Sequence, residues 1–216
     1  MSIPSVLVLP GPAQGHVYPM MNFSQKLVEN GCKVYFVNTD FNHKRVVSSM
    51  VEQQESLDES LVKLVSIPDG LRPEDDRTDF VKLFDAILST MPSMLQRKIE
   101  EIHLYGEDRI SCIVADVNMG WALNVGNKLG IKGALFWPAS AAMFAFQCNI
   151  PALIDKGIID SDDGLNGSLS NYDREFHDYG GREFDEVIGE YMKPVYAAEQ
   201  IFFEVVDDEV IGCLLI

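Results

Sequence analysis

The chain alternates short, almost continuous apolar runs with stretches of helical periodicity, and no other feature of the sequence restricts the fold as strongly. Strands with such composition are buried on both faces, as in a parallel sheet. Because parallel neighbours need a crossover helix, the alternation predicts an α/β fold with a doubly wound parallel sheet. The apolar runs are residues 5–10, 33–38, 61–67, 110–115 and 133–137.

Helices are predicted between these runs. In the first, Met20, Phe23 and Leu27 recur at helical spacing, and Gly31 stands where a helix would end. Residues 68–77 form the clearest irregular stretch. The other helical stretches are residues 41–50, 79–88, 92–104, 121–129 and 139–153.

The charge is distributed unevenly along the 216 residues. Residues 1–154 carry 13 Lys and Arg against 17 Asp and Glu, whereas residues 155–216 carry 4 against 16. No basic stripe is available to contact a phosphate backbone, so we expect no nucleic-acid partner. The acidic end of the chain has the composition of a solvated surface.

The periodic pattern weakens after Gly164. We therefore predict an amino-terminal Rossmann-like domain of residues 1–164 and a divergent acidic tail of residues 165–216. Helix and strand are hard to separate over the short apolar segments of this tail. Its regular segments are residues 183–200, which fit an amphipathic helix, and residues 201–206 and 210–216.

The sequence shows no targeting or metal-binding pattern. The first four residues have no charged region, and the apolar run at residues 6–9 is too short for a signal peptide or a membrane span. We expect a cytoplasmic protein. The four cysteines lie far apart with no histidine at ligand spacing, so we expect no metal.

A glycine-bearing turn with a histidine follows the first apolar run. Residues 11–19 read Gly-Pro-Ala-Gln-Gly-His-Val-Tyr-Pro and lead into the first helix. Ligands of open α/β sheets bind at such a place. The turn matches neither a Walker loop nor Gly-x-Gly-x-x-Gly. Instead it holds His16, whose imidazole can transfer a proton near neutral pH.

Asp116 is the second candidate, because it ends the apolar run at residues 110–115. In the strand order 3-2-1-4-5-6, strands one and four are neighbours, which would bring Asp116 beside His16. A carboxylate there would fix the imidazole tautomer and stabilise the imidazolium. An aspartate in this position is also a frequent helix N-cap. The helix terminus lowers and the carboxylate raises the pKa of His16, and the sequence leaves the balance open.

Over about residues 5–164, several separated motifs are together highly specific. The chain resembles the opening of plant family 1 UDP-glycosyltransferases, which have the GT-B fold. The motifs are Pro12-Ala13-Gln14-Gly15-His16-x-x-Pro19, Phe36-Val37-Asn38-Thr39 with Phe41-Asn42-His43, Ser66-Ile67-Pro68-Asp69-Gly70-Leu71, and Val114-Ala115-Asp116 with Trp121.

The resemblance implies an inverting sugar transfer without a metal or bound cofactor. His16 would be the general base, Asp116 its partner, and a UDP-sugar, expected to be UDP-glucose, the co-substrate. The acceptor would be a hydroxyl of a small hydrophobic alcohol or phenol of plant secondary metabolism. The family's carboxy-terminal donor-binding domain has no counterpart in the sequence, so we expect a truncated chain that is inactive alone.

The resemblance also implies contacts to the two substrates. Gly15 and Ser140 are the candidates for binding the donor. Many relatives have a small hydroxyl residue that touches the sugar at the position of Pro138, so this contact is either missing or supplied by Ser140. Most apolar residues at helical spacing belong to a core, which is the alternative for the acceptor candidates. These candidates are Gln14, Phe84, Met119, Trp137 and Phe144.

Two other interpretations stay open. Gly11 and Gly15 after a strand, with Asp40 ending the next one, also fit a nicotinamide-dinucleotide-binding domain. The missing third glycine and the histidine in the turn count against it. Alternatively, the chain is a non-catalytic module that binds a small molecule or a partner. Its exposed interdomain face would then favour self-association.

Overall fold

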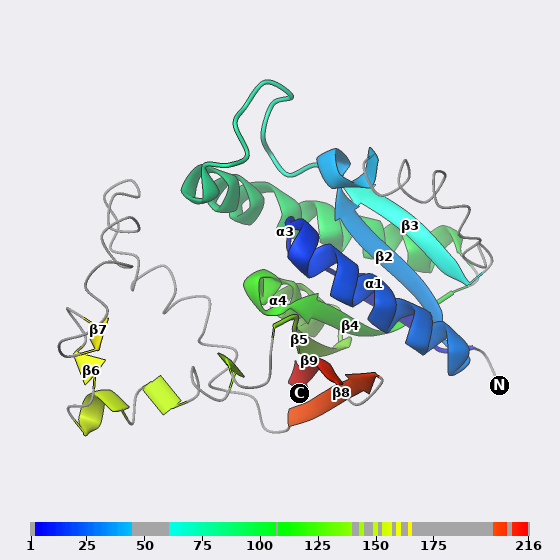
Figure 1. Ribbon diagram of the computed structural model, residues 1–216. Helices are drawn as coiled ribbons and strands as arrows, with labels where there is room; N and C mark the ends of the chain where they lie inside the picture. Colours follow the sequence, from blue (N-terminus) through cyan, green and yellow to red (C-terminus); the bar gives the residue numbers. More distant parts are fainter. Residues whose placement is uncertain are drawn as a thin grey trace.

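The computed structural model describes residues 3–44, 61–106, 108–139, 143–144, 149–150, 153–156, 159–160, 164–165, 201–206 and 209–215. Its centre is a parallel sheet in which the five amino-terminal strands have the order β3-β2-β1-β4-β5 (Figure 1). All five predicted strands and the α/β fold class are confirmed. These strands are β1 (Ser5–Leu9), β2 (Lys33–Thr39), β3 (Val62–Ile67), β4 (Ile110–Asp116) and β5 (Lys132–Trp137).

Helices cover both faces of this sheet. Helix α1 (Gln14–Glu29) lies on one face, and α3 (Phe80–Tyr105) and α4 (Trp121–Lys128) lie on the other (Figure 1). Successive strand residues point to opposite faces. In β1, Val8 packs with the α1 layer and Leu7 with the α3 and α4 layer. Burial on both faces explains why the strand sequences are almost continuously apolar.

Helix α3 corrects the prediction of two helices at residues 79–88 and 92–104, because it runs unbroken through Pro92. A proline inside a helix costs about 3 kcal/mol. Fully burying one large apolar side chain contributes about 1.5–3 kcal/mol, so the buried stripe outweighs the proline. Asp79 caps the helix by accepting a hydrogen bond from the Lys82 amide at 3.0 Å. The stripe comprises Leu83, Ile87, Met91, Leu95 and Ile99.

Asp108, just before β4, binds three side chains near the amino ends of the strands. Lys33 and Lys63 donate to its carboxylate at 2.8 and 3.2 Å, and the Tyr35 hydroxyl donates as well. Burial alone would raise the pKa of Asp108, but these donors outweigh it and lower the pKa to about 2. The cluster ties β2, β3 and β4 together at the end of the sheet opposite the His16 turn.

Two strands of the predicted tail join the same sheet. Strands β8 (Ile201–Val206) and β9 (Glu209–Leu215) are antiparallel, and β9 pairs antiparallel with β5. These apolar segments, which sequence left open between helix and strand, are therefore strands. Strands β6 (Ile159–Asp160) and β7 (Gly164–Leu165) form a separate pair. The division of the chain near residue 164 stays a prediction.

The other predicted helices are only partly described. The segment after β2 is helical at residues 40–44, and residues 45–50 lie outside the described part. Within the stretch at residues 139–153, residues 143–144, 149–150 and 153 are helical, residue 139 is a bend, and the others lie outside the described part. The predicted tail helix also lies outside the described residues. Within the described part of the chain, no helix has the length and apolarity that crossing a membrane requires.

Candidate active site

The turn between β1 and α1 places His16 at the carboxyl end of the sheet. Ala13 is the helix N-cap residue, and its carbonyl accepts hydrogen bonds from the amides of His16 and Val17, both at 3.0 Å. The imidazole therefore projects from the first turn of α1. The side chain of His16 is 29% exposed, so one side of the ring is open to a ligand.

His16 and Asp116 are hydrogen-bonded, as the strand order predicts. Strands β1 and β4 are neighbours with Leu9 opposite Ala115, and Nδ1 of His16 donates to Oδ2 of the fully buried Asp116 at 2.7 Å. Burial acts to lower the pKa of His16, but the hydrogen bond and the negative charge of Asp116 outweigh it and raise the pKa above 6.5. The pairing leaves Nε2 to accept a proton.

Asp116 has a second role through its other carboxylate oxygen. Its Oδ1 accepts from the backbone amide of Asn118 at 2.9 Å, which caps the short 3₁₀ helix η1 (Val117–Met119). The carboxylate of Asp116 thus acts both as an N-cap and as the hydrogen-bond partner of His16, the two interpretations considered for it above. The cap fixes the carboxylate in the orientation that His16 needs.

A pocket of about 650 Å³ opens beside His16. Its walls come from the β1–α1 turn, the end of β2 with the helical segment after it, the loop between β3 and α3, and the first turn of α3. Both apolar and polar side chains line it. The apolar side chains are Phe41, Pro73, Phe80, Leu83 and Phe84, and the polar ones include Thr39, Asn42, Asp76, Arg77, Thr78 and Asn118.

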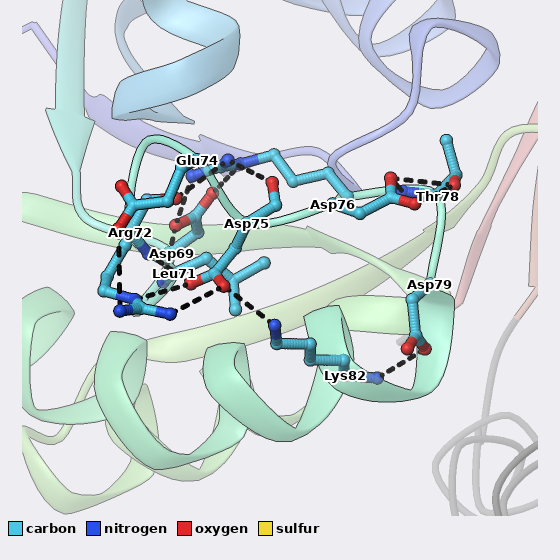
Figure 2. A network of polar contacts seen from close by, with 10 residues as sticks. Asp69, Leu71, Arg72, Glu74, Asp75, Asp76, Thr78, Asp79 and Lys82 are labelled. Carbon is cyan, nitrogen blue, oxygen red and sulfur yellow. Dashed lines mark hydrogen bonds and ion pairs between the residues drawn. The ribbon is translucent and has the colours of Figure 1, made fainter.

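The loop between β3 and α3 is held by a polar network (Figure 2). Asp69 is nearly fully buried, and it accepts from the Leu71 amide at 2.9 Å and from Nε of Arg77 at 2.8 Å. Asp75 accepts from the amide of Arg72 at 2.9 Å and from Lys82 at 2.8 Å, and these contacts lower its pKa. These contacts connect the loop to itself and to α3 along this wall of the pocket.

The predicted acceptor residues occupy different places. Phe84 lines the pocket, whereas Gln14 lies exposed on the first turn of α1. Met119, Trp137 and Phe144 are buried in the core cluster between the sheet and α3, where the Trp137 and Phe144 rings are 5.5 Å apart. The structure thus brings Phe84 to the His16 pocket. The acceptor role of each residue stays a prediction.

Of the two residues predicted to contact the donor, the structure describes Gly15 but not Ser140. Gly15 is exposed in the first turn of α1, and a Cβ atom added there would meet nothing within 4 Å. Ser140 lies outside the described residues. Among the residues that are described, no group of three His, Cys, Asp or Glu side chains is arranged to hold a metal ion.

Several pocket residues were missed at the sequence level. Phe80 and Leu83 share a face with Phe84 at helical spacing, so the pattern that selected one contained all three. Arg77 gave no signal, because a loop residue has no periodicity to show what it contacts. Asp69 belongs to a recognisable motif, but nothing in the sequence indicates that its partner is eight residues away.

Known proteins resemble this chain over part of their length, although no protein-family profile matches it. UDP-glycosyltransferase 83A1 of Arabidopsis thaliana is 42% identical over 166 residues, which is 75% of this chain and 36% of that protein. A 7-deoxyloganetin glucosyltransferase of Gardenia jasminoides is 34% identical over 156 residues, 69% of this chain and 32% of that protein. The chain spans about a third of these curated relatives.

Solved structures share the fold. A UDP-glucose:anthocyanidin 3-O-glucosyltransferase in complex with UDP matches with a TM-score of 0.64 and 21% identity, covering 90% of this chain and 45% of the other. Os79 of O. sativa with UDP matches with a TM-score of 0.54 and 19% identity, over 71% of this chain and 36% of the other. Together with the sequence matches, this likeness shows that the chain belongs to the plant UDP-glycosyltransferase family.

Proposed function

We propose that this chain supplies the acceptor site and the general base of a UDP-dependent glycosyltransferase. The observation that carries the proposal is that His16, hydrogen-bonded to the buried Asp116, lines a pocket about 650 Å³ in volume. A base oriented by a carboxylate beside a preformed pocket is the arrangement that deprotonation of a bound hydroxyl requires.

The proposed reaction is the inverting transfer that the family resemblance implies, and the orientation of the imidazole suits it. Nε2 of His16 removes the proton of an acceptor hydroxyl as that oxygen forms a bond to the anomeric carbon of a UDP-sugar. The bond from the anomeric carbon to the phosphate oxygen breaks on the opposite side, so the configuration inverts and UDP leaves. Asp116 holds Nδ1–H and stabilises the positive charge that His16 acquires. No step requires a metal.

The walls of the pocket support a small, mostly hydrophobic acceptor. Phe80, Leu83 and Phe84 provide an apolar surface, while Asn42 and Thr78 offer polar atoms near it. Related proteins are named for glucosylation of 7-deoxyloganetin and of (R)-mandelonitrile, both small alcohols. We therefore propose a small plant alcohol or phenol as the acceptor and UDP-glucose as the donor.

The donor is proposed to lie near the first turn of α1. Glycine inside a helix costs about 1 kcal/mol relative to alanine, and the described neighbours of Gly15 leave room for a side chain. An exposed glycine at a helix amino terminus lets a phosphate approach the backbone amides closely. Gly15 is the proposed contact, and Ser140 stays a candidate.

We also propose that these 216 residues do not transfer sugar by themselves. The matches cover only about a third of the relatives, and transfer requires donor and acceptor to be held about 3–3.5 Å apart. The cytoplasmic location and self-association stay predictions.

The test compares the chain with a chimera in which residues 1–164 are joined to the remainder of the Arabidopsis relative. Each is incubated with UDP-glucose and a panel of phenols and terpenoid alcohols, and glucosides are detected by mass spectrometry. We expect glucosides from the chimera and none from the chain. A chimera that folds and binds UDP but glucosylates no member of a broad panel would contradict the proposed function.

A further inference from the structure

We propose that Arg77 and Asp69 are positioning residues that hold the loop between β3 and α3 as a fixed wall of the pocket, and that this wall limits the width of the acceptor. The inference rests on the proposed function, because it takes the pocket beside His16 as the acceptor site. Neither residue is assigned a part in the chemistry. They act on the acceptor through the loop that they hold.

Arg77 uses its guanidinium to bind three parts of the loop at once. Nε and Nη2 donate to the two oxygens of Asp69 at 2.8 and 3.2 Å, and Nη1 donates to the backbone carbonyls of Arg72 and Asp75 at 3.3 and 3.2 Å. A planar guanidinium can make these bonds together because its five donors have fixed directions. The side chains of Arg77 and Asp69 are only 14% and 4% exposed.

The same guanidinium also contacts the segment that follows β2. Its central carbon lies 4.5 Å from the ring centroid of Phe41, a distance typical of a cation–π contact. Phe41 and Arg77 both line the pocket. Arg77 therefore joins the loop to the segment after β2, so this side chain contributes to the spacing between these two parts of the pocket wall.

The ends of the loop are fixed independently of Arg77. Leu71 packs against the core cluster, and Asp79 caps α3. Between these anchors the loop passes Pro73, Asp75 and Thr78, which face the pocket. Removing the guanidinium would leave Lys82 bound to Asp75 but would remove all of the loop's contacts to Arg77, so the loop would loosen between its anchored ends and the pocket would widen on this side.

Arg72 provides a matched control in the same loop. It is also an arginine paired with carboxylates, but its side chain is 73% exposed and its contacts to Asp75 are 3.4 Å long. Exposed pairs of this kind contribute little. The backbone amide and carbonyl of Arg72 keep their loop contacts when its side chain is removed. Arg72→Ala therefore removes an arginine side chain from the loop while leaving the hydrogen bonds of Arg77 in place.

The experiment measures the affinity of the full 216-residue chain for a narrow phenol, 1-naphthol, and a wider one, quercetin, by fluorescence. We expect Arg77→Ala to weaken 1-naphthol binding about tenfold, since the free loop must be ordered again on binding. Quercetin binding should weaken less, so the ratio of the two affinities shifts toward the wider ligand. Arg72→Ala should leave both affinities within about twofold of the parent.

Arg77→Lys is the second variant. An ammonium keeps the charge beside Asp69 but cannot make the four directed bonds, so it should shift the affinity ratio in the same direction as alanine. Thermal unfolding of each variant and the NMR titration of His16 check that the fold and the catalytic pair are intact. General destabilisation would weaken both ligands equally and leave their ratio unchanged.

The outcomes separate the two proposals. If the parent binds both phenols and the folded Arg77 variants show its affinity ratio, the positioning role is wrong and the acceptor site stands. If Arg77→Lys shows the parental affinity ratio, a positive charge beside Asp69 is sufficient, and the proposal that the directed hydrogen bonds of Arg77 hold the loop is also wrong. If the parent binds neither phenol, nor any member of the acceptor panel, the acceptor assignment itself is overturned, and the role of Arg77 falls with it.

Discussion

The backbone of Gly11 lies so close to His16 that a Cβ atom at residue 11 would stand 3.2 Å from Nδ1 of the imidazole. The same atom would be 3.4 Å from the carboxylate carbon of Asp116. The first distance is shorter than an ordinary van der Waals separation and the second lies at its lower limit, and both neighbours are held by their mutual hydrogen bond. Because Gly11 has no side chain, there is space beside it for the hydrogen-bonded side chains of His16 and Asp116.

Gly11→Ala should accordingly disturb the His16–Asp116 pair. The added methyl displaces the imidazole, the hydrogen bond lengthens, and the raised pKa of His16 moves back toward 6.5. NMR titration of the His16 ring protons measures this midpoint. Gly15→Ala is the matched control, because its Cβ would meet nothing within 4 Å. The same midpoint in Gly11→Ala and the parent would show that the site tolerates the methyl.

Asp116→Asn should lower the pKa of His16 below 6.5. The variant removes the negative charge that raises the pKa and leaves the burial that lowers it. The expected result is a titration midpoint on the acid side of a free histidine. A midpoint that stays above 6.5 would mean that another group holds the proton on His16.

The raised pKa of His16 also predicts a pH dependence of stability. The folded state binds the proton more tightly than the unfolded chain, so this contribution is complete below pH 6.5 and is lost as the pH rises through the folded pKa. The stability advantage of the parent over His16→Gln should therefore be larger at about pH 5.5 than at about pH 9. Urea unfolding at the two pH values measures it, and an advantage that grows with pH would contradict the assignment.

His16→Ala should abolish most sugar transfer by the chimera described above. General-base catalysis contributes about 10²–10⁴ in rate, so we expect a loss of that order in kcat with little change in acceptor affinity. Tyr18→Ala, which changes a residue 68% exposed on the same helix, serves as the control. A loss of less than about tenfold in His16→Ala would remove His16 from the role of base.

Asp108→Asn should destabilise the fold without altering the site. Lys33 would then be left partly buried beside a neutral amide, and losing one partner of such a cluster costs about 1–3 kcal/mol. The exposed pair of Lys26 and Glu29 supplies the control, since Glu29→Gln should change stability by less than about 0.5 kcal/mol. The pKa of Asp108 is lowered to about 2, so its contribution is present above about pH 4 and is lost as the pH falls toward 2.

Gly70→Ala should be far more destabilising than Gly31→Ala, although both glycines have positive φ, 88° and 81°. A Cβ at Gly70 would be 2.5 Å from Oγ1 of Thr90 and 2.7 Å from the carbonyl oxygen of Ala86, whereas one at Gly31 would meet nothing within 4 Å. Gly31→Ala carries only the backbone penalty of about 1–2 kcal/mol. We expect Gly70→Ala to exceed about 3 kcal/mol, measured by thermal unfolding. Equal losses of stability in the two variants would mean that α3 shifts enough to accommodate the methyl group at residue 70.

The sheet and the proximity of His16 to Asp116 could be predicted because strong general rules govern them. Burial on both faces made the strands visible as continuous apolar runs, and the few strand orders available to a doubly wound sheet placed Asp116 beside His16. The pKa balance at His16 could not be predicted. It depends on how deeply the ring is buried and on a 2.7 Å contact, and neither is encoded in residue spacing.

Tertiary packing decided the features that the sequence did not reveal. Pro92 indicated a break in α3, because proline disfavours the interior of a helix. The helix continues because the buried apolar residues on both sides of Pro92 stabilise it by more than the proline costs. Arg77 lies in a segment without periodicity, and its importance comes from a carboxylate and two carbonyls that the loop folds around it. A linear pattern contains neither kind of information.

Asp116 makes two different contacts with its two oxygen atoms. Serine, threonine or asparagine could replace it as a cap for Asn118, but none would supply the negative charge that His16 contacts. Glutamate would keep the charge but place it one methylene farther from the backbone. A lineage that drifted under selection for folding alone would therefore be free to exchange this residue for other caps. Under the proposed function, aspartate would be retained at this position in every lineage that keeps the reaction.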